Sequence, residues 1–117
     1  MKRIYHLESC STNQRILKSL DTTGFELINI KTNNIDEETL DWLAEKVGSY
    51  EALFSKKAMK YKSMGLKDKK LTEQDFKRLM LQEYTFLKRP FIIDGEKIFI
   101  GNAKATVEAA QEVLNNK

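Results

Sequence analysis

The sequence is poor in the residues that build metal centres and disulfide frameworks, because its 117 residues include one cysteine, one histidine and one proline. A single cysteine excludes an intrachain disulfide and a multi-cysteine metal site, and a lone histidine argues against zinc. The sequence also lacks an apolar run long enough for a signal peptide or a membrane span. These absences predict a protein without a bound metal, without a membrane partner and located in the cytoplasm.

Short apolar runs predict strands near both ends of the chain, with helices between them. The runs at 4–7 and 25–30 are rich in β-branched and aromatic residues, which is typical of strands. Between them, apolar residues at helical spacing predict a helix that starts near Ser11 and ends at Gly24. This order of strand, helix and strand predicts a βαβ unit.

A hairpin signal predicts the second pair of strands. The apolar runs at 91–93 and 97–100 flank Asp94-Gly95-Glu96, in which the Asp-Gly pair favours a tight turn because it tolerates positive φ. A final helix follows, and Asn102 is expected to be its N-cap. The C-terminal part is therefore predicted to be a ββα unit.

The segment between these two units is predicted to be helical. One helix is expected between Asp36 and Gly48, where glycine ends it. Another is expected to start at Thr72, which opens a capping box. The region of about 36–87 is therefore predicted to be a helical insertion in a single domain, 1–117, that buries roughly two-thirds of its unfolded surface.

A βαβ unit followed by a ββα unit is the layout of a thioredoxin-like α/β domain with one mixed sheet. Pro90 is consistent with this layout because it opens the third strand, at a place where a sheet tolerates proline. In thioredoxin-like folds a cis proline at that point lies against the active-site cysteine. We therefore expect Pro90 to be a structural residue of the site.

Cys10 lies where the first strand gives way to the first helix. A helix N-terminus presents N–H groups and a partial positive charge, which favour a thiolate and can hold an anion beside it. Ser11 and Gln14 have the spacing of a capping box, which would place Cys10 just before the cap. Ser11, Thr12 and Asn13 are then candidate anion-binding residues. The alternative is an inert cysteine packed as a small hydrophobe.

Positive charge is concentrated in one segment of a chain whose net charge is +3. Such a segment can attract nucleic acid, an acidic protein or a small oxyanion, or it can simply be a solvated face. The segment contains no arginine and one aromatic residue, Tyr61, which argues against nucleic acid. Its seven lysines, opposed by Asp68 alone, are Lys56, Lys57, Lys60, Lys62, Lys67, Lys69 and Lys70.

Several short motifs, spread over nearly the whole chain, resemble one known family. The most specific motif is an Arg-Pro step followed by a hairpin. The residues that carry the resemblance are Tyr5-His6 with Cys10 four positions after the histidine, Thr12, Leu53-Phe54, Tyr61, Met64-Gly65-Leu66, Leu87-Lys88-Arg89-Pro90-Phe91, Asp94-Gly95 and Ile100-Gly101. Together they resemble the ArsC family of glutaredoxin-dependent arsenate reductases and the related Spx-type regulators.

The resemblance implies a cytoplasmic thiol oxidoreductase with no bound cofactor. Cys10 would attack arsenate, glutathione would serve as co-substrate, and a glutaredoxin would remove the glutathione. Arg89 would hold an oxyanion or a glutathione carboxylate through its planar guanidinium. His6 matches a family histidine that could tune the thiolate. The alternative for His6 is a half-buried strand residue.

The chain departs from the family pattern at two of its three arginine positions. Ser55 aligns with one of the missing arginines and Asn102 with the other. Lys56 and Lys57 adjoin the first position and could supply charge, but a lysine cannot reproduce bidentate binding of an oxyanion. If each lost contact contributes about 1.5–3 kcal/mol, oxyanion binding would weaken by roughly two to four decades.

Two other classes of function stay open. The first is a Spx-like regulator or adaptor that binds RNA polymerase or another acidic protein through the lysine-rich segment, without turnover. Asn13 stands where the second cysteine of a Cys-x-x-Cys switch would be, which excludes a disulfide-switched version. The second is an inert domain of the same fold that merely retains Cys10.

Overall fold

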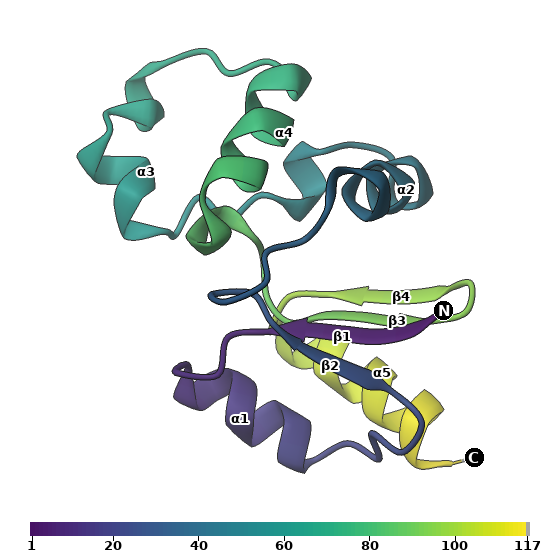
Figure 1. The fold of residues 1–117 in the computed structure, drawn as a ribbon. Helices are drawn as coiled ribbons and strands as arrows, with labels where there is room; N and C mark the ends of the chain where they lie inside the picture. The colour runs from purple at the N-terminus through teal and green to yellow at the C-terminus, as the bar shows by residue number, and fades with distance from the viewer. Residues whose placement is uncertain (117) are drawn as a thin grey trace. The chain divides into compact units, whose positions relative to one another are not determined.

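The computed structural model describes residues 1–116. This part of the chain contains four strands, five α-helices and three short 3₁₀ helices (Figure 1). In chain order the elements are β1 (Lys2–His6), α1 (Ser11–Lys18), β2 (Glu26–Asn29), α2 (Glu37–Val47), η1 (Glu51–Leu53), α3 (Met59–Ser63), η2 (Leu66–Asp68), α4 (Glu73–Gln82), η3 (Tyr84–Phe86), β3 (Phe91–Asp94), β4 (Lys97–Ile100) and α5 (Lys104–Asn115). Among these residues, no helix has both the length and the apolar character needed to cross a bilayer.

The chain divides into two compact units, which we call the sheet unit and the helical unit. The sheet unit contains residues 1–33 and 89–116, and the helical unit contains residues 34–88. The helical unit corresponds to the region 36–87 that the sequence predicts as an insertion. Strands at both ends of the chain therefore come together in one unit, as their order predicts.

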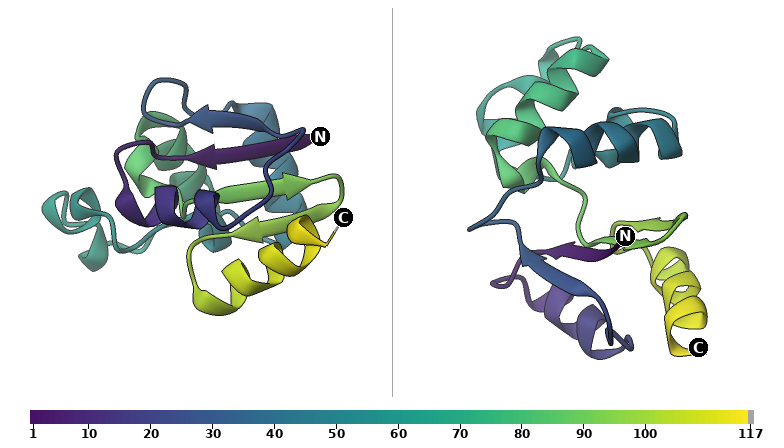
Figure 2. Two further views of the ribbon diagram at one scale, coloured as in Figure 1. Left: turned by 90° about the horizontal axis from the view of Figure 1, so that it is seen from below. Right: turned by 45° about the vertical axis from the view of Figure 1, so that its right-hand side comes forward.

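The sheet unit contains one mixed sheet with the strand order β2-β1-β3-β4 (Figure 2, left). β1 pairs in parallel with β2 and antiparallel with β3, so that Ile4 lies between Leu27 and Ile92. β3 and β4 form the predicted hairpin, in which Asp94 pairs with Lys97. The βαβ and ββα units predicted from the sequence are thus confirmed.

The hairpin turn differs in detail from the prediction. Asp94 belongs to β3, so the two-residue loop is Gly95-Glu96. Gly95 has a φ of 63°, whereas no non-glycine residue among those described has positive φ. A positive φ at the first loop position alone is typical of a type II′ turn, which glycine favours.

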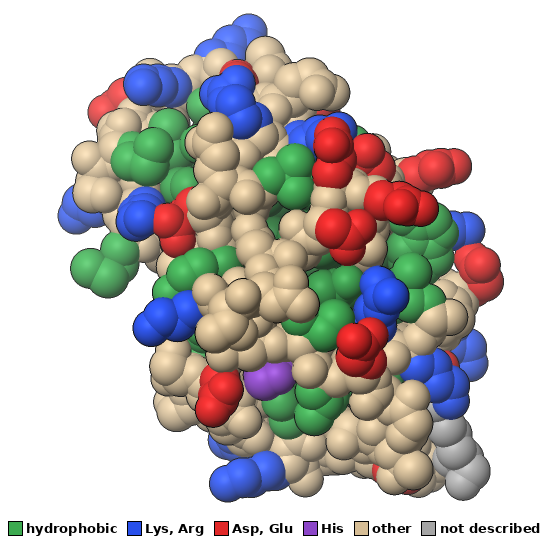
Figure 3. All heavy atoms as spheres, viewed as in Figure 1, with side chains coloured by type: hydrophobic (Ala, Val, Ile, Leu, Met, Phe, Trp, Pro, Cys, Tyr) green, Lys and Arg blue, Asp and Glu red, His purple; other side chains and the backbone are tan. Residues whose placement is uncertain are grey.

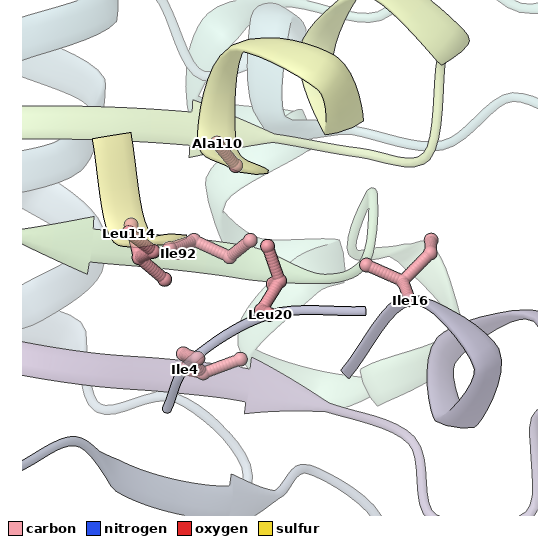
Figure 4. Packing of buried hydrophobic residues seen from close by; sticks show 6 residues of the cluster. All are labelled: Ile4, Ile16, Leu20, Ile92, Ala110 and Leu114. Carbon is pink, nitrogen blue, oxygen red and sulfur yellow. The ribbon is translucent and has the colours of Figure 1, made fainter. Parts of the chain in front are cut away.

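Helices α1 and α5 cover the same face of the sheet (Figure 1). Apolar side chains of these helices, and that of Leu20 just after α1, meet those of the two inner strands in one cluster, drawn in Figure 4: Ile4, Ile16, Leu20, Ile92, Ala110 and Leu114. All six residues are buried, because the apolar positions of α1 and α5 recur at helical spacing and those of the strands share one face. This packing fixes where α1 begins relative to the end of β1.

The helical unit is built around aromatic rings. The ring of Phe54 stacks on that of Phe86 at 4.9 Å and meets Phe76 at 4.9 Å and Tyr61 at 5.9 Å between centroids. Phe54 and Phe86 are each only 1% exposed. Large rings at these distances form one buried aromatic cluster in the apolar core of the unit.

The helix boundaries predicted in the helical unit are confirmed. Asp36 is the N-cap of α2, where its carboxylate accepts from the backbone N–H of Thr39, and Gly48 ends α2 with a φ of 101°. Thr72 and Asp75 form the capping box at the start of α4. In each case the cap residue supplies a partner that the helix end lacks.

Two boundaries predicted in the sheet unit are wrong. α1 ends at Lys18 rather than at Gly24, because the backbone N–H and the hydroxyl of Ser19 both donate to the carbonyl of Ile16 and close the last turn. The N-cap of α5 is Ala103, not Asn102. The carbonyl of Ala103 accepts the first helical hydrogen bond, from the backbone N–H of Val107.

Candidate functional site

Cys10 is itself the N-cap of α1. Its backbone is extended, with φ −90° and ψ 113°, and its carbonyl accepts from the backbone N–H of Gln14 at 3.1 Å. The Cys10 side chain is partly exposed, and no side chain caps this helix. The first-turn N–H groups of α1 therefore have no side-chain acceptor from the cap, and the one thiol lies at the positive end of the helix dipole.

The capping box predicted for Ser11 and Gln14 is wrong. The Gln14 side chain turns back toward β1, where its Nε2 donates to the carbonyl of Leu7 at 3.3 Å. The same Nε2 lies 3.4 Å from Nδ1 of His6. Gln14 thus connects α1 to the end of β1 instead of capping its own helix.

Residues 7–10 form a tight turn whose backbone is held by α1. The backbone N–H of Cys10 donates to the carbonyl of Leu7 at 3.0 Å, and Oδ1 of Asn13 accepts from the backbone N–H of Leu7 at 2.9 Å. Asn13 is fully buried, and its Nδ2 has no hydrogen-bond partner among the residues described. Asn13, expected among the anion-binding residues, thus holds the turn through its carbonyl oxygen.

A second amide, that of Asn29, holds the other side of this turn. Its Oδ1 accepts from the backbone N–H of Glu8 at 3.2 Å, and its Nδ2 donates to the Glu8 carboxylate at 3.3 Å. Sequence reasoning missed Asn29, since Glu8 is 21 positions away. The available signal was a polar residue ending the strand that pairs in parallel with β1, where the register places Asn29 beside His6.

His6 is the last residue of β1 and is 8% exposed. Burial lowers the pKa of His6 below its usual value, while the charge of Glu8 acts weakly in the opposite direction. The neutral imidazole is therefore favoured near neutral pH. With the Gln14 amide as donor, Nδ1 is the acceptor and the proton lies on Nε2.

Arg89 and Pro90 lead into β3 at the same end of the sheet. Phe91 pairs with Tyr5 in antiparallel register, so the two residues before Phe91 continue toward the end of β1 that carries His6. The Arg89–Pro90 peptide bond is cis, in agreement with the thioredoxin-like pattern. Pro90 is buried, and its carbonyl accepts from the backbone N–H of Gly101 at 2.9 Å.

The family assignment follows from this arrangement and from a match that extends over most of the chain. Residues 5–110 match the model of the ArsC family. This chain belongs to the ArsC family. The match begins in β1, includes Cys10 and Arg89, and ends in α5, so the resemblance seen in the short motifs is confirmed.

Individual ArsC relatives agree with this assignment. The chain is 31% identical over 102 residues to the uncharacterized protein YusI of Bacillus subtilis, which covers 83% of this chain and 86% of YusI. It is 28% identical over 93 residues to an arsenate reductase of Escherichia coli, which covers 77% of this chain and 66% of the enzyme's length. The arsenate reductase structure from Vibrio cholerae matches with a TM-score of 0.76 at 22% identity, over 97% of both chains. The predicted thioredoxin-like fold is thereby confirmed.

Within this ArsC-family chain, the sheet unit brings together most of the candidate residues. The turn and first turn of α1 carry Cys10, Ser11, Thr12 and Asn13, and the adjacent strand ends carry His6, Arg89 and Pro90. Ser11 is exposed and Thr12 half-buried. This set offers a thiol, a hydroxyl-bearing helix start and a guanidinium at one end of one sheet, which suits attack on an anionic substrate.

The remaining candidates belong to the helical unit. The backbone N–H of Ser55 donates to the carbonyl of Phe86 at 2.7 Å, and Lys56 forms an ion pair with Glu51 at 2.6 Å. Lys57 is exposed. Both of these contacts are internal to the helical unit.

In the described part of the chain, no group of three or more His, Cys, Asp or Glu side chains gathers in a way that could hold a metal ion.

Proposed function

We propose that this ArsC-family protein is a thiol-dependent reductase of the arsenate reductase type, with Cys10 as its nucleophile. The observation that carries the proposal is the position of Cys10 as the N-cap of α1, partly exposed and beside first-turn N–H groups. A helix N-terminus stabilises both a thiolate and an incoming anion. Membership of the ArsC family supports this assignment of the thiol.

In the proposed cycle, the Cys10 thiolate attacks arsenic and forms an S–As bond, while one arsenate oxygen leaves as water after protonation. A glutathione thiolate then attacks Sγ of Cys10, and the electrons of the S–As bond pass to arsenic, which leaves as arsenite. Glutathione and Cys10 are thus joined as a mixed disulfide. A second thiol, delivered through a glutaredoxin, releases glutathione and restores Cys10. This cycle needs the reducing conditions of the cytoplasm.

Arg89 is proposed to hold the oxyanion or a carboxylate of glutathione through paired N–H groups. His6 does not supply a second cation at neutral pH, because burial lowers its pKa. Stabilisation of negative charge then falls to the helix N-terminus and to Arg89, with Ser11 and Thr12 as candidate hydroxyl donors. Replacing Arg89 by lysine should raise KM for the anion about tenfold or more, because a lysine cannot bind in the same bidentate way.

Ser55 and Asn102 should affect how tightly arsenate binds, not the reactivity of the Cys10 thiol. With serine and asparagine where the family pattern has arginines, arsenate should bind weakly, with a KM well above that of a relative with all three arginines. Arsenate should therefore be tested over a wide range of concentrations. The matched gain-of-function variants are Ser55→Arg and Asn102→Arg, which should lower this KM.

The decisive experiment measures arsenate reduction by the purified protein with glutathione, glutaredoxin and glutathione reductase, followed by NADPH consumption. The Cys10→Ser variant should lose all turnover while keeping its thermal unfolding midpoint, because serine has a similar volume but cannot form the mixed disulfide. Ser63→Ala, in the exposed helix α3, serves as the control. Turnover that persists in Cys10→Ser would contradict the proposal.

A second candidate function rests on the surface around α3. None of the residues of α3 is buried, and Met59 and Met64 are 89% and 48% exposed beside the lysines of the segment 56–70. Figure 3 shows blue Lys and Arg side chains and green hydrophobic ones over the area that α3 occupies in Figure 1. Such a surface suits an acidic protein, RNA polymerase among the candidates, bound by a Spx-like regulator.

The two functions make opposite predictions for Cys10. If the protein is a regulator, its Cys10→Ser variant should bind the partner as well as the native protein does. Binding should weaken when Lys57 and Lys62 are both changed to glutamate. A pull-down with purified RNA polymerase, with the native protein and both variants, tests this. Turnover that depends on Cys10, with no such binding, would exclude the regulator.

A further inference from the structure

The turn that carries Cys10 has its backbone groups bonded from two directions. Asn13 and Gln14 of α1 bind the N–H and the carbonyl of Leu7, at 2.9 Å and 3.3 Å. From the opposite side, Asn29 binds both the backbone N–H and the side-chain carboxylate of Glu8, at 3.2 Å and 3.3 Å. Three amide side chains thus meet a turn of four residues.

Asn29 is suited to this position by its place in the sheet. It is the last residue of β2, and the parallel register sets it beside His6, the last residue of β1. Its Oδ1 also accepts from the backbone N–H of Lys31 at 3.4 Å. This local contact helps to orient the Asn29 amide toward Glu8. A planar amide that accepts on one side and donates on the other fits the adjacent N–H and carboxylate of one residue.

We propose that Asn29 is a positioning residue for Cys10, and that its paired hydrogen bonds with Glu8 hold the turn so that the thiol stays at the N-terminus of α1. This inference rests on the proposed role of Cys10 as nucleophile. Asn29 has no part in bond making. It acts through Glu8, two residues before Cys10, by limiting the conformations that the turn can adopt.

The donor and the acceptor of the hydrogen bond between the side chains of Asn29 and Glu8 can be exchanged by mutation. In Asn29→Asp, two carboxylates face each other and the side-chain bond is lost, although the backbone N–H of Glu8 keeps an acceptor. In the double variant Asn29→Asp with Glu8→Gln, the new amide can donate to the new carboxylate. The double variant also keeps the net charge of the native pair, so it separates geometry from charge near the thiol.

The test measures the alkylation rate of Cys10 by iodoacetamide in the folded protein, and the same rate in denaturant as a baseline. Asn29→Ala and Asn29→Asp should each slow alkylation in the folded protein by about three- to tenfold. The double variant should return to within about twofold of the native rate. The control is Asn33→Ala, an exposed asparagine four positions along the chain, which should leave the rate unchanged. In denaturant the rate for Asn29→Ala and Asn33→Ala should equal that of the native chain.

An unchanged rate in Asn29→Ala would overturn the inference, as would a double variant no faster than Asn29→Asp. If Asn29 had only a structural role, both single variants would have a lower thermal midpoint. The double variant would then not restore the alkylation rate of Cys10. Failure of the proposed function has a different signature, because the native protein would then show no turnover that depends on Cys10, whatever the alkylation rates of the Asn29 variants are.

Discussion

The turn that carries Cys10 and the contact between α2 and α4 use polar side chains in different ways. In the sheet unit, three neutral amides, those of Asn13, Gln14 and Asn29, bind the backbone of one turn. In the helical unit, charged pairs join neighbouring elements: Lys77 bonds to Glu37 at 2.7 Å and to Asp41 at 3.0 Å, which ties α4 to α2. Amide bonds to backbone are independent of pH and little affected by salt, so they suit a turn that keeps one geometry.

The apolar cores of the units also differ. The sheet unit packs aliphatic side chains between strands and two helices, whereas the helical unit packs Phe54 against three other rings. Exposed ion pairs contribute little to stability, so the stability of the helical unit rests on its buried apolar side chains, the ring of Phe54 among them. Substitutions in each unit should therefore show which residues contribute to stability and which hold the turn that carries the thiol.

The largest change in stability is expected from the aromatic cluster. Phe54→Ala should lower the free energy of unfolding by about 3–5 kcal/mol, because it removes a fully buried ring and leaves a cavity. Denaturation in guanidinium chloride measures this loss. Phe99→Ala, at a partly buried position of the sheet unit, is the matched control and should cost less than half as much. Equal losses would refute the view that the helical unit depends on Phe54.

A smaller loss is expected from the buried amide of the sheet unit. Asn13→Ala should lower the free energy of unfolding by about 1–3 kcal/mol, because the backbone N–H of Leu7 would lose its acceptor in a buried place. Urea denaturation of this variant beside Asn33→Ala gives the comparison. If Asn13→Ala were as stable as the native chain, the hydrogen bond to Leu7 would have no energetic role.

The capping box of α4 should contribute about 1 kcal/mol to the helical unit. Thr72→Ala removes the hydroxyl that accepts from the backbone N–H of Asp75, which leaves a helix end without that partner. Thr23→Ala, in an exposed turn of the sheet unit, should change stability by no more than about 0.5 kcal/mol. Both values are measured from chemical denaturation, and a larger loss for Thr23→Ala would reverse the assignment.

The smallest effect is on the pH dependence of stability, and it also distinguishes the units. Burial lowers the pKa of His6 in the folded sheet unit, so the unfolded chain binds the proton more tightly. The contribution of His6 is therefore complete above about pH 6.5 and is lost as the pH falls through the folded pKa. The unfolding midpoint should decline as the pH falls below about 6.5, and His6→Asn should flatten this decline.

Carboxylates of the helical unit should act in a more acidic window. The hydroxyl of Tyr50, and then Lys77, lower the pKa of Asp41, and Lys60 lowers that of Glu83. Their contributions are present above about pH 4 and lost as the pH falls below it. A decline near pH 6 that persists unchanged in His6→Asn would show that another group is responsible.

Much of the fold could be predicted because its signals are local. The positions of the strands along the chain follow from short apolar runs, and the start of α4 follows from Thr72 and Asp75, which lie three positions apart. The start of α1 was predicted only in part. Ser11 and Gln14 have the spacing of a capping box. Gln14 instead bonds to His6 and Leu7, which lie at and just after the C-terminal end of β1 and are brought near by the tertiary fold.

The thiol and the Arg-Pro step could be located from the sequence, but the residues that hold the thiol could not. Asn29 contacts Glu8 only because β1 and β2 lie in parallel register, and spacing along the chain does not encode that contact. The role of Asn13 was missed for the same reason. Its residue type fits either an exposed anion-binding position or a buried acceptor for Leu7, and burial is decided by the packing of α1.

The place of β1 inside the sheet has a consequence for how the protein opens. β1 is hydrogen-bonded on one side to β2 and on the other to β3, whereas β2 and β4 each have one neighbour. Edge strands detach first in local unfolding, so backbone amides of β1 should exchange their hydrogens with solvent more slowly than those of β2 or β4. The turn with Cys10 follows an inner strand, so its anchor should stay closed when an edge of the sheet opens.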